Sequence, residues 1–108
     1  MSQPDFGLPP GTIEAIRKIL ATEGALRRAV IFGSRAKGNY RPGSDIDLAL
    51  FGDGLDLDAL GRITALLDES PIPYQVDVCL YDSIDNPALR EHIERVGKVF
   101  YEAKPCAT

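Results

Sequence analysis

The chain has 108 residues, of which 44% are hydrophobic and 26% are charged, and its formal net charge is −4. This length predicts one domain, and this composition is typical of a soluble globular protein. No apolar run reaches the roughly 20 residues that cross a bilayer, and the first residues show no secretory signal, so we expect a cytoplasmic protein without a membrane partner. The acidic balance argues against direct binding of nucleic acid.

Proline marks the start of the chain, and apolar periodicity begins after it. Residues 1–11 hold three prolines and predict a flexible lead-in, followed by a single domain over residues 12–103 and a tail over 104–108. Apolar residues at helical spacing predict three main helices, which begin near residues 12, 57 and 87. Asp56 and Asn86 are the expected N-caps of the last two, and Gly97 is the expected C-cap of the third.

Four apolar or alternating runs predict strands, over residues 28–32, 45–51, 75–81 and 99–101. Helices and strands therefore alternate, which predicts an α/β (α+β) fold with a small mixed sheet and helices on one face. Within two of these strands, Asp45, Asp47 and Asp77 are each offset by one residue from aliphatic neighbours. Because side chains alternate along a strand, we expect the three acids on the face away from the helices.

Charge is distributed unevenly around these strands. Residues 29–44 hold three basic residues and no acidic one, whereas residues 45–85 hold ten acidic residues and one basic residue. A basic, glycine-rich stretch beside an acidic one suits a site that handles phosphate and metal together. Random patterning of a solvated surface is the alternative.

The three aspartates form the strongest candidate site. Asp45 and Asp47 project from the same side of one strand, with Cα atoms roughly 6–7 Å apart. Carboxylates this close repel each other, and a hard cation such as Mg²⁺ relieves the repulsion while binding phosphate oxygens. With Asp77, the three acids match the ligand count of a two-metal phosphoryl-transfer site. The alternative is a solvated strand face.

A second candidate is the turn that follows the first strand. Gly33 would allow the backbone to approach a phosphate, and Ser34 would add a hydroxyl donor. The patterns of a P-loop and of a dinucleotide-binding fingerprint are absent. An ordinary strand-to-helix turn capped by Ser34 is the alternative.

The two candidates together resemble a known motif. The run Gly33-Ser34-Arg35-Ala36-Lys37-Gly38, followed by Ser44-Asp45-Ile46-Asp47-Leu48, is similar to the nucleotidyltransferase motif of the DNA polymerase beta superfamily. The short chain resembles the minimal nucleotidyltransferases of prokaryotes. Val76-Asp77-Val78 stands where that family carries its third acid, and residues 93–102 are similar to its usual ending. The resemblance covers about residues 12–102.

The resemblance implies a polymerase beta-like fold and a set of roles. Asp45, Asp47 and Asp77 would be catalytic and would hold two Mg²⁺ ions. The triphosphate would be bound by a second set of residues: Gly33, Ser34, Arg35 and Lys37. Such enzymes transfer a nucleoside monophosphate from a triphosphate, here expected to be AMP from ATP.

The resemblance also implies a protein partner. Many members pair with a HEPN-type toxin and act as its antitoxin, and some add AMP to a toxin tyrosine. Two alternatives remain open: an antitoxin that only binds and occludes its partner, and an aminoglycoside-type enzyme that modifies a small molecule.

Four further residues complete the candidates. Arg41 and Tyr81 could contact the nucleotide, although sheet packing is the alternative for Tyr81. His92 is expected at the boundary of a helix stripe, and Cys79 as a half-buried filler on the acid face.

Overall fold

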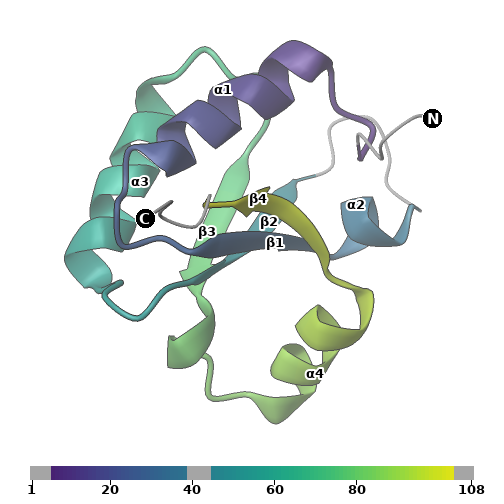
Figure 1. Ribbon diagram of the computed structural model, residues 1–108. Helices are drawn as coiled ribbons and strands as arrows, with labels where there is room; N and C mark the ends of the chain where they lie inside the picture. The colour runs from purple at the N-terminus through teal and green to yellow at the C-terminus, as the bar shows by residue number, and fades with distance from the viewer. Residues whose placement is uncertain (1–5, 39–44, 104–108) are drawn as a thin grey trace.

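A computed structural model describes residues 6–38 and 45–103 (Figure 1). The predicted alternation of helices and strands is confirmed. The elements are α1 (Pro10–Ala21), β1 (Arg28–Phe32), α2 (Ser34–Lys37), β2 (Ile46–Phe51), α3 (Leu57–Glu69), β3 (Val76–Leu80), the 3₁₀ turn η1 (Tyr81–Ser83), α4 (Pro87–Val96) and β4 (Lys98–Glu102).

The predicted N-caps begin the two later helices. Asp56 accepts a hydrogen bond from the Ala59 N–H at the start of α3. Asn86 accepts hydrogen bonds from the first N–H groups of α4, with Pro87 in the first helical position. Each cap satisfies donors that the helix itself leaves unpaired, so both boundaries follow from local chemistry.

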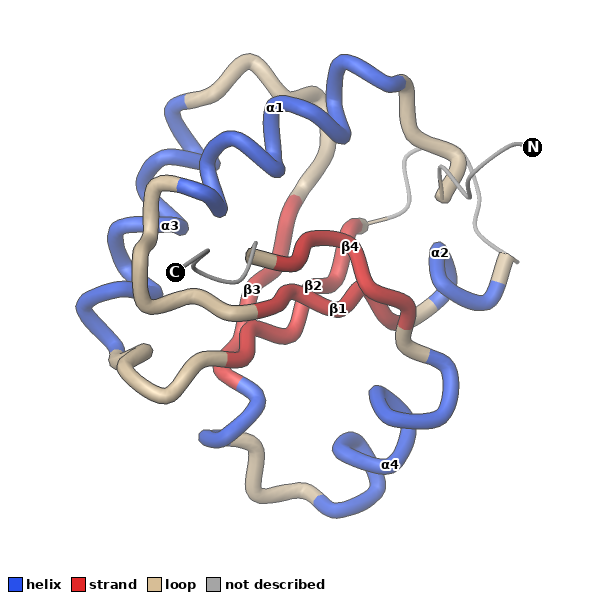
Figure 2. The backbone as a smooth tube through the Cα atoms, in the orientation of Figure 1, coloured by secondary structure: helices blue, strands red, loops and turns tan. Residues whose placement is uncertain are grey.

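The four strands form one mixed sheet in the order β3-β2-β1-β4. β1 is antiparallel to both of its neighbours, whereas β2 and β3 are parallel. Figure 2 shows the sheet at the centre of the molecule, with α1 on one side and α4 on the other. The mixed α/β fold class is therefore confirmed.

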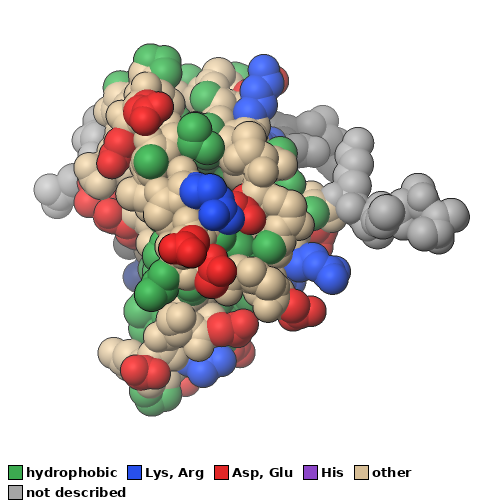
Figure 3. Space-filling view, turned by 90° about the vertical axis from the view of Figure 1, so that its left-hand side faces the viewer, with side chains coloured by type: hydrophobic (Ala, Val, Ile, Leu, Met, Phe, Trp, Pro, Cys, Tyr) green, Lys and Arg blue, Asp and Glu red, His purple; other side chains and the backbone are tan. Residues whose placement is uncertain are grey.

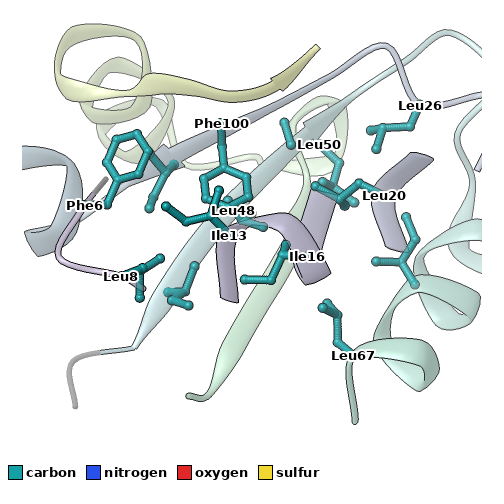
Figure 4. Packing of buried hydrophobic residues seen from close by; sticks show 14 of the residues in the cluster. Phe6, Leu8, Ile13, Ile16, Leu20, Leu26, Leu48, Leu50, Leu67 and Phe100 are labelled. Atoms are coloured by element: carbon teal, nitrogen blue, oxygen red, sulfur yellow. The ribbon is translucent and has the colours of Figure 1, made fainter. Parts of the chain in front are cut away.

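The main core lies between the sheet and the helices α1 and α3. Ile46, Leu48 and Leu50 all belong to it, as their alternation in the sequence predicts. They pack with buried residues of the two helices, among them Ile63 of α3 and Ile16 of α1, the latter labelled in Figure 4. This packing leaves the opposite side of β2 for the acidic residues.

The position of α4 corrects the expectation that the helices share one face. Ile93 of α4 packs with Val30, Ala49 and Tyr81 in a second cluster on the opposite face. The acids occupy only one end of that face. The rest of it carries apolar residues of β1 and β2, and the apolar side of α4 packs against them. α4 therefore covers part of the sheet face that carries the acids.

The start of the chain is a second correction. Phe6 and Leu8 are buried in the main core beside Phe100 and Ile13 (Figure 4). α1 begins at Pro10 rather than at residue 12, because proline is compatible with the first turn of a helix. The segment 6–11 therefore belongs to the folded domain, while residues 1–5 and 104–108 lie outside the described part.

The outer surface around α3 is mixed in character. Figure 3 shows acidic and basic side chains interspersed with separate hydrophobic ones on this side. Arg62 of α3 pairs with Glu23, the residue after the turn that closes α1. In the described residues, no helix has both the length and the apolar character that a membrane crossing requires.

Candidate active site

Asp47 lies at the centre of the candidate site. It is the second residue of β2, and it pairs in register with Phe32 of β1 on one side and Asp77 of β3 on the other. Residues paired across neighbouring strands project from the same face of a sheet. The expectation that Asp47 and Asp77 share one face is confirmed.

Negative charge accumulates around Asp47. Burial raises the pKa of its carboxyl group, and the neighbouring carboxylates of Asp77 and Asp45 raise it further. Asp45 lies immediately before β2, and both it and Asp77 are exposed, while Asp47 is half-buried. Three carboxylates therefore act on one another at an open end of the sheet.

Gly33 brings the turn after β1 against the same carboxylate. Its backbone has φ 79° and ψ −155°, a conformation that is almost restricted to glycine. A Cβ atom built on Gly33 would lie 2.7 Å from Asp47 Oδ2. The absence of a side chain therefore lets the turn and the acid approach each other.

The turn continues into α2, a single helical turn. The Lys37 N–H donates to the Gly33 carbonyl, and the Gly38 N–H donates to the Ser34 carbonyl. Ser34 is half-buried and Lys37 is exposed. Gly33 thus lies beside Asp47, Ser34 is the next residue of the turn, and Lys37 lies at its far end.

Arg35, which is expected to contact phosphate, is buried against other parts of the protein. Its side chain is 3% exposed, and Nη1 donates to the Phe6 carbonyl at 2.8 Å. Its guanidinium also lies over the Tyr74 ring, 5.1 Å from the centroid. A four-residue helix is too short for its periodicity to reveal which residue points inward, so these contacts cannot be predicted from the sequence of α2 alone.

The donor set fits magnesium, although the acids do not form a closed cage. All three candidate ligands are carboxylates, which hard cations prefer, and the raised pKa of Asp47 reflects negative charge that a cation would neutralise. Across residues 6–38 and 45–103, no three acidic, histidine or cysteine side chains already converge on one metal position. Such a site fits an ion that shares its ligands with the phosphates of a substrate.

The other candidate residues are accounted for by packing. Tyr81 stacks on Phe51 with ring centroids 4.5 Å apart, and its hydroxyl donates to the Glu94 carboxylate. Cys79 is half-buried on the acid face, where burial and then the charge of Asp47 raise the pKa of its thiol. Arg41 lies outside the described residues.

His92 is closer to the site than the sequence indicates. From α4, its ring meets Phe32 edge to face, with centroids 6.3 Å apart, and Phe32 is the cross-strand neighbour of Asp47. Only the docking of α4 on the acid face brings His92 there, so no local pattern could have predicted it.

A cavity of about 840 Å³ lies elsewhere, at the opposite ends of β1 and β2. Arg28 and Phe51, which pair in register, line it together with Asp82 and Glu102. The candidate chemistry is at the other end of these strands, so the acid site is an open surface and not this cavity.

Three comparisons with known proteins bear on this site. Residues 14–105 match the family described as "Polymerase beta, Nucleotidyltransferase". A protein of Methanocaldococcus jannaschii that bears the name "Putative protein adenylyltransferase MJ0435" is 41% identical over 69 residues, which are 63% of this chain and 72% of that protein.

Solved structures agree with the family in fold. A minimal nucleotidyltransferase is 30% identical with a TM-score of 0.64, and the match covers 91% of this chain and 98% of that one. A chain of a toxin–antitoxin crystal structure with AMP-PNP is 26% identical with a TM-score of 0.69, over 85% of this chain and 74% of that one. The chain therefore belongs to the polymerase beta nucleotidyltransferase family, and it is a nucleotidyltransferase.

Proposed function

We propose that the protein is a magnesium-dependent adenylyltransferase, which moves AMP from ATP onto a tyrosine hydroxyl of a HEPN-type toxin and thereby acts as its antitoxin. The proposal rests on the position of Asp47, which pairs with Asp77 across β2 and β3 and lies against the Gly33 turn on its other side. This arrangement brings a phosphate-binding turn and a carboxylate cluster into contact.

The turn residues and the three aspartates have different roles in the proposed reaction. The turn of Gly33 and Ser34 would hold the triphosphate, and Asp45 and Asp47 would hold Mg²⁺, with two ions expected. When bound, magnesium neutralises phosphate charge and makes the acceptor hydroxyl more acidic. Asp77 would complete the metal site on the acceptor side and would take the acceptor's proton as the tyrosine oxygen bonds to the α-phosphorus and pyrophosphate leaves.

The openness of the site supports a macromolecular acceptor. Asp45 and Asp77 are exposed at the end of the sheet, so within residues 6–38 and 45–103 their carboxylates are accessible to a tyrosine on another protein. The name of the archaeal relative and the toxin–antitoxin assembly of a structural neighbour point the same way. We place this reaction in the cytoplasm, where ATP and magnesium are both available.

Co-expression with a HEPN-type partner tests the proposal, and a HEPN-type gene found beside this gene would be the partner to use. Mass spectrometry of that partner should show added AMP with the wild type and none with Asp47→Asn, although the variant still co-purifies with it. An interface of ordinary size involves roughly 20–30 residues on each side, so one acid-to-amide change leaves binding intact. An unmodified partner that both proteins neutralise would establish occlusion instead.

A small-molecule acceptor is the other alternative, and the same material distinguishes it. Incubation of the purified protein with labelled ATP and an aminoglycoside should yield no adenylylated drug. Modification of the drug with an unmodified protein partner would overturn the proposed acceptor.

A further inference from the structure

Arg35 connects two segments that are distant in the sequence. It follows Ser34 in the phosphate-binding turn, and its buried guanidinium donates to the carbonyl of Phe6. The same group lies over the ring of Tyr74. One side chain therefore contacts both the start of the folded domain and the loop that leads into β3.

Tyr74 lies immediately before the residue at which the pairing of β3 with β2 begins, close in the sequence to Asp77. The next residue, Gln75, accepts a hydrogen bond from the Ile46 N–H at the first residue of β2 through its carbonyl, at 2.9 Å. Asp47 and Asp77 follow within two residues of these two positions. The contact between Arg35 and Tyr74 therefore ties the turn to the place where β2 and β3 present their carboxylates.

We propose that Arg35 is a positioning residue, which fixes the Gly33–Ser34 turn at the correct distance from Asp47 and Asp77 by anchoring it to Phe6 and Tyr74. This inference rests on the proposed function. Arg35 does not touch the nucleotide; it acts through the backbone of the turn. The segment that begins at Phe6 becomes part of the support of the active site.

Arginine has properties that this position requires. A planar guanidinium can donate to a carbonyl while its face lies on an aromatic ring, whereas a lysine ammonium is a point charge without such a face. Misplacement of reacting groups by about 1 Å from a distant substitution can cost about a hundredfold in rate. The anchor is therefore expected to affect substrate affinity and turnover beyond its effect on stability.

The chain contains a chemically matched control. Arg17 of α1 donates from Nε to the Phe100 carbonyl at 2.8 Å and lies over the Phe100 ring, 5.3 Å from its centroid. It makes the same two kinds of contact, but it ties α1 to β4 and not the turn to the acids. Arg17 is exposed, so Leu20→Ala, at a fully buried residue of the main core, provides a second control that should lower stability by leaving a cavity in the core.

Calorimetric binding of Mg·ATP measures the effect without any acceptor. At a temperature where each variant is folded, Arg35→Met should weaken binding about tenfold or more, as expected for a displaced turn. Arg17→Met and Leu20→Ala should stay within about twofold of the wild type, since neither alters the geometry of the turn. Arg35→Lys should recover only part of the loss.

Each outcome has a separate meaning. Absence of Mg·ATP binding by the wild type would overturn the proposed function itself. Wild-type affinity in Arg35→Met would overturn the positioning role and leave the function standing, and equal losses in all three variants would reduce Arg35 to a stabilising residue. If Arg35→Met does not fold, Tyr74→Leu removes the other half of the contact, and unchanged affinity there would refute the proposal.

Discussion

Gly33 and Asp47 approach each other so closely that a Cβ on the glycine would lie 2.7 Å from Asp47 Oδ2. The turn after β1 and the central carboxylate of β2 therefore form one surface. In the proposed function, a phosphate bound to the backbone of this turn would lie beside Asp47. This contact explains why the two sequence motifs need to occur together.

Gly33→Ala tests this contact. Alanine would have to adopt a backbone conformation that is almost restricted to glycine, at a cost of about 1–3 kcal/mol, and its Cβ would displace the Asp47 carboxylate. We expect a lower melting temperature and loss of Mg·ATP binding, measured by thermal unfolding and calorimetry. Gly61→Ala is the control, because nothing lies within 4 Å of its added Cβ inside α3, and it should stabilise the protein. Normal nucleotide binding by Gly33→Ala would show that the turn does not contact the substrate.

Asp47→Asn should change stability in a pH-dependent way. The pKa of Asp47 is raised above its ordinary value of 3.8, so the folded state holds this proton more tightly than the unfolded state. Its contribution to stability is present below pH 3.8 and is lost as pH rises through the raised pKa of the folded state. At neutral pH without metal, we expect the variant to be more stable than the wild type by about 0.2–1 kcal/mol, the scale of a cross-strand pair.

Chemical denaturation at pH 3, 5 and 7 in chelator measures this difference. The advantage of Asp47→Asn should shrink toward the lowest pH, where the wild-type carboxyl group is also neutral. Asp53→Asn, in the exposed turn after β2, should behave like the wild type at each pH. A large loss of stability in Asp47→Asn at neutral pH would instead identify Asp47 as a structural hydrogen-bonding residue.

The sequence predicts those parts of the fold that depend on neighbours along the chain. The alternation of Ile46, Asp47 and Leu48 fixes which side of β2 faces the core, because adjacent side chains must point to opposite faces. Asp56 and Asn86 satisfy helix donors within three residues of themselves, so both helix starts are visible locally. The same alternation predicts that the acids lie on the sheet face opposite the aliphatic residues of β2.

The parts that were missed depend on contacts between distant segments. Arg35 resembles a phosphate ligand in the motif, and only the folding of Phe6 and Tyr74 around it makes it an anchor. His92 reaches the acid face because α4 docks there. No periodicity within a short element records such a contact.

Gly97 ends α4 where the sequence predicts, but the need for glycine there comes from packing and not from backbone conformation. The residue ends α4 as expected, but its φ of −64° is accessible to any residue. A Cβ here would lie 2.2 Å from the Ile93 carbonyl oxygen and 2.4 Å from Val30 Cγ1. We expect Gly97→Ala to lower the free energy of unfolding by about 1–3 kcal/mol through overpacking between α4 and β1. Denaturant titration measures this loss, and a stability equal to that of Gly24→Ala, which meets nothing within 4 Å, would contradict the packing explanation.

Removal of the metal should abolish stabilisation by nucleotide. A ligand that binds only the folded state at a hundredfold excess over its Kd adds about 2.7 kcal/mol, and each kcal/mol shifts the melting temperature of a domain this size by roughly 4–8 °C. Mg·ATP should therefore raise the melting temperature of the wild type clearly, whereas ATP in excess chelator should raise it little.

Asp77→Asn should reduce the magnesium-dependent part of the shift, because a lost carboxylate removes charge and geometry that the rest of the sheet cannot replace. Asp53→Asn should retain the full shift, and an equal shift for wild-type protein with and without chelator would exclude a metal role for the three aspartates.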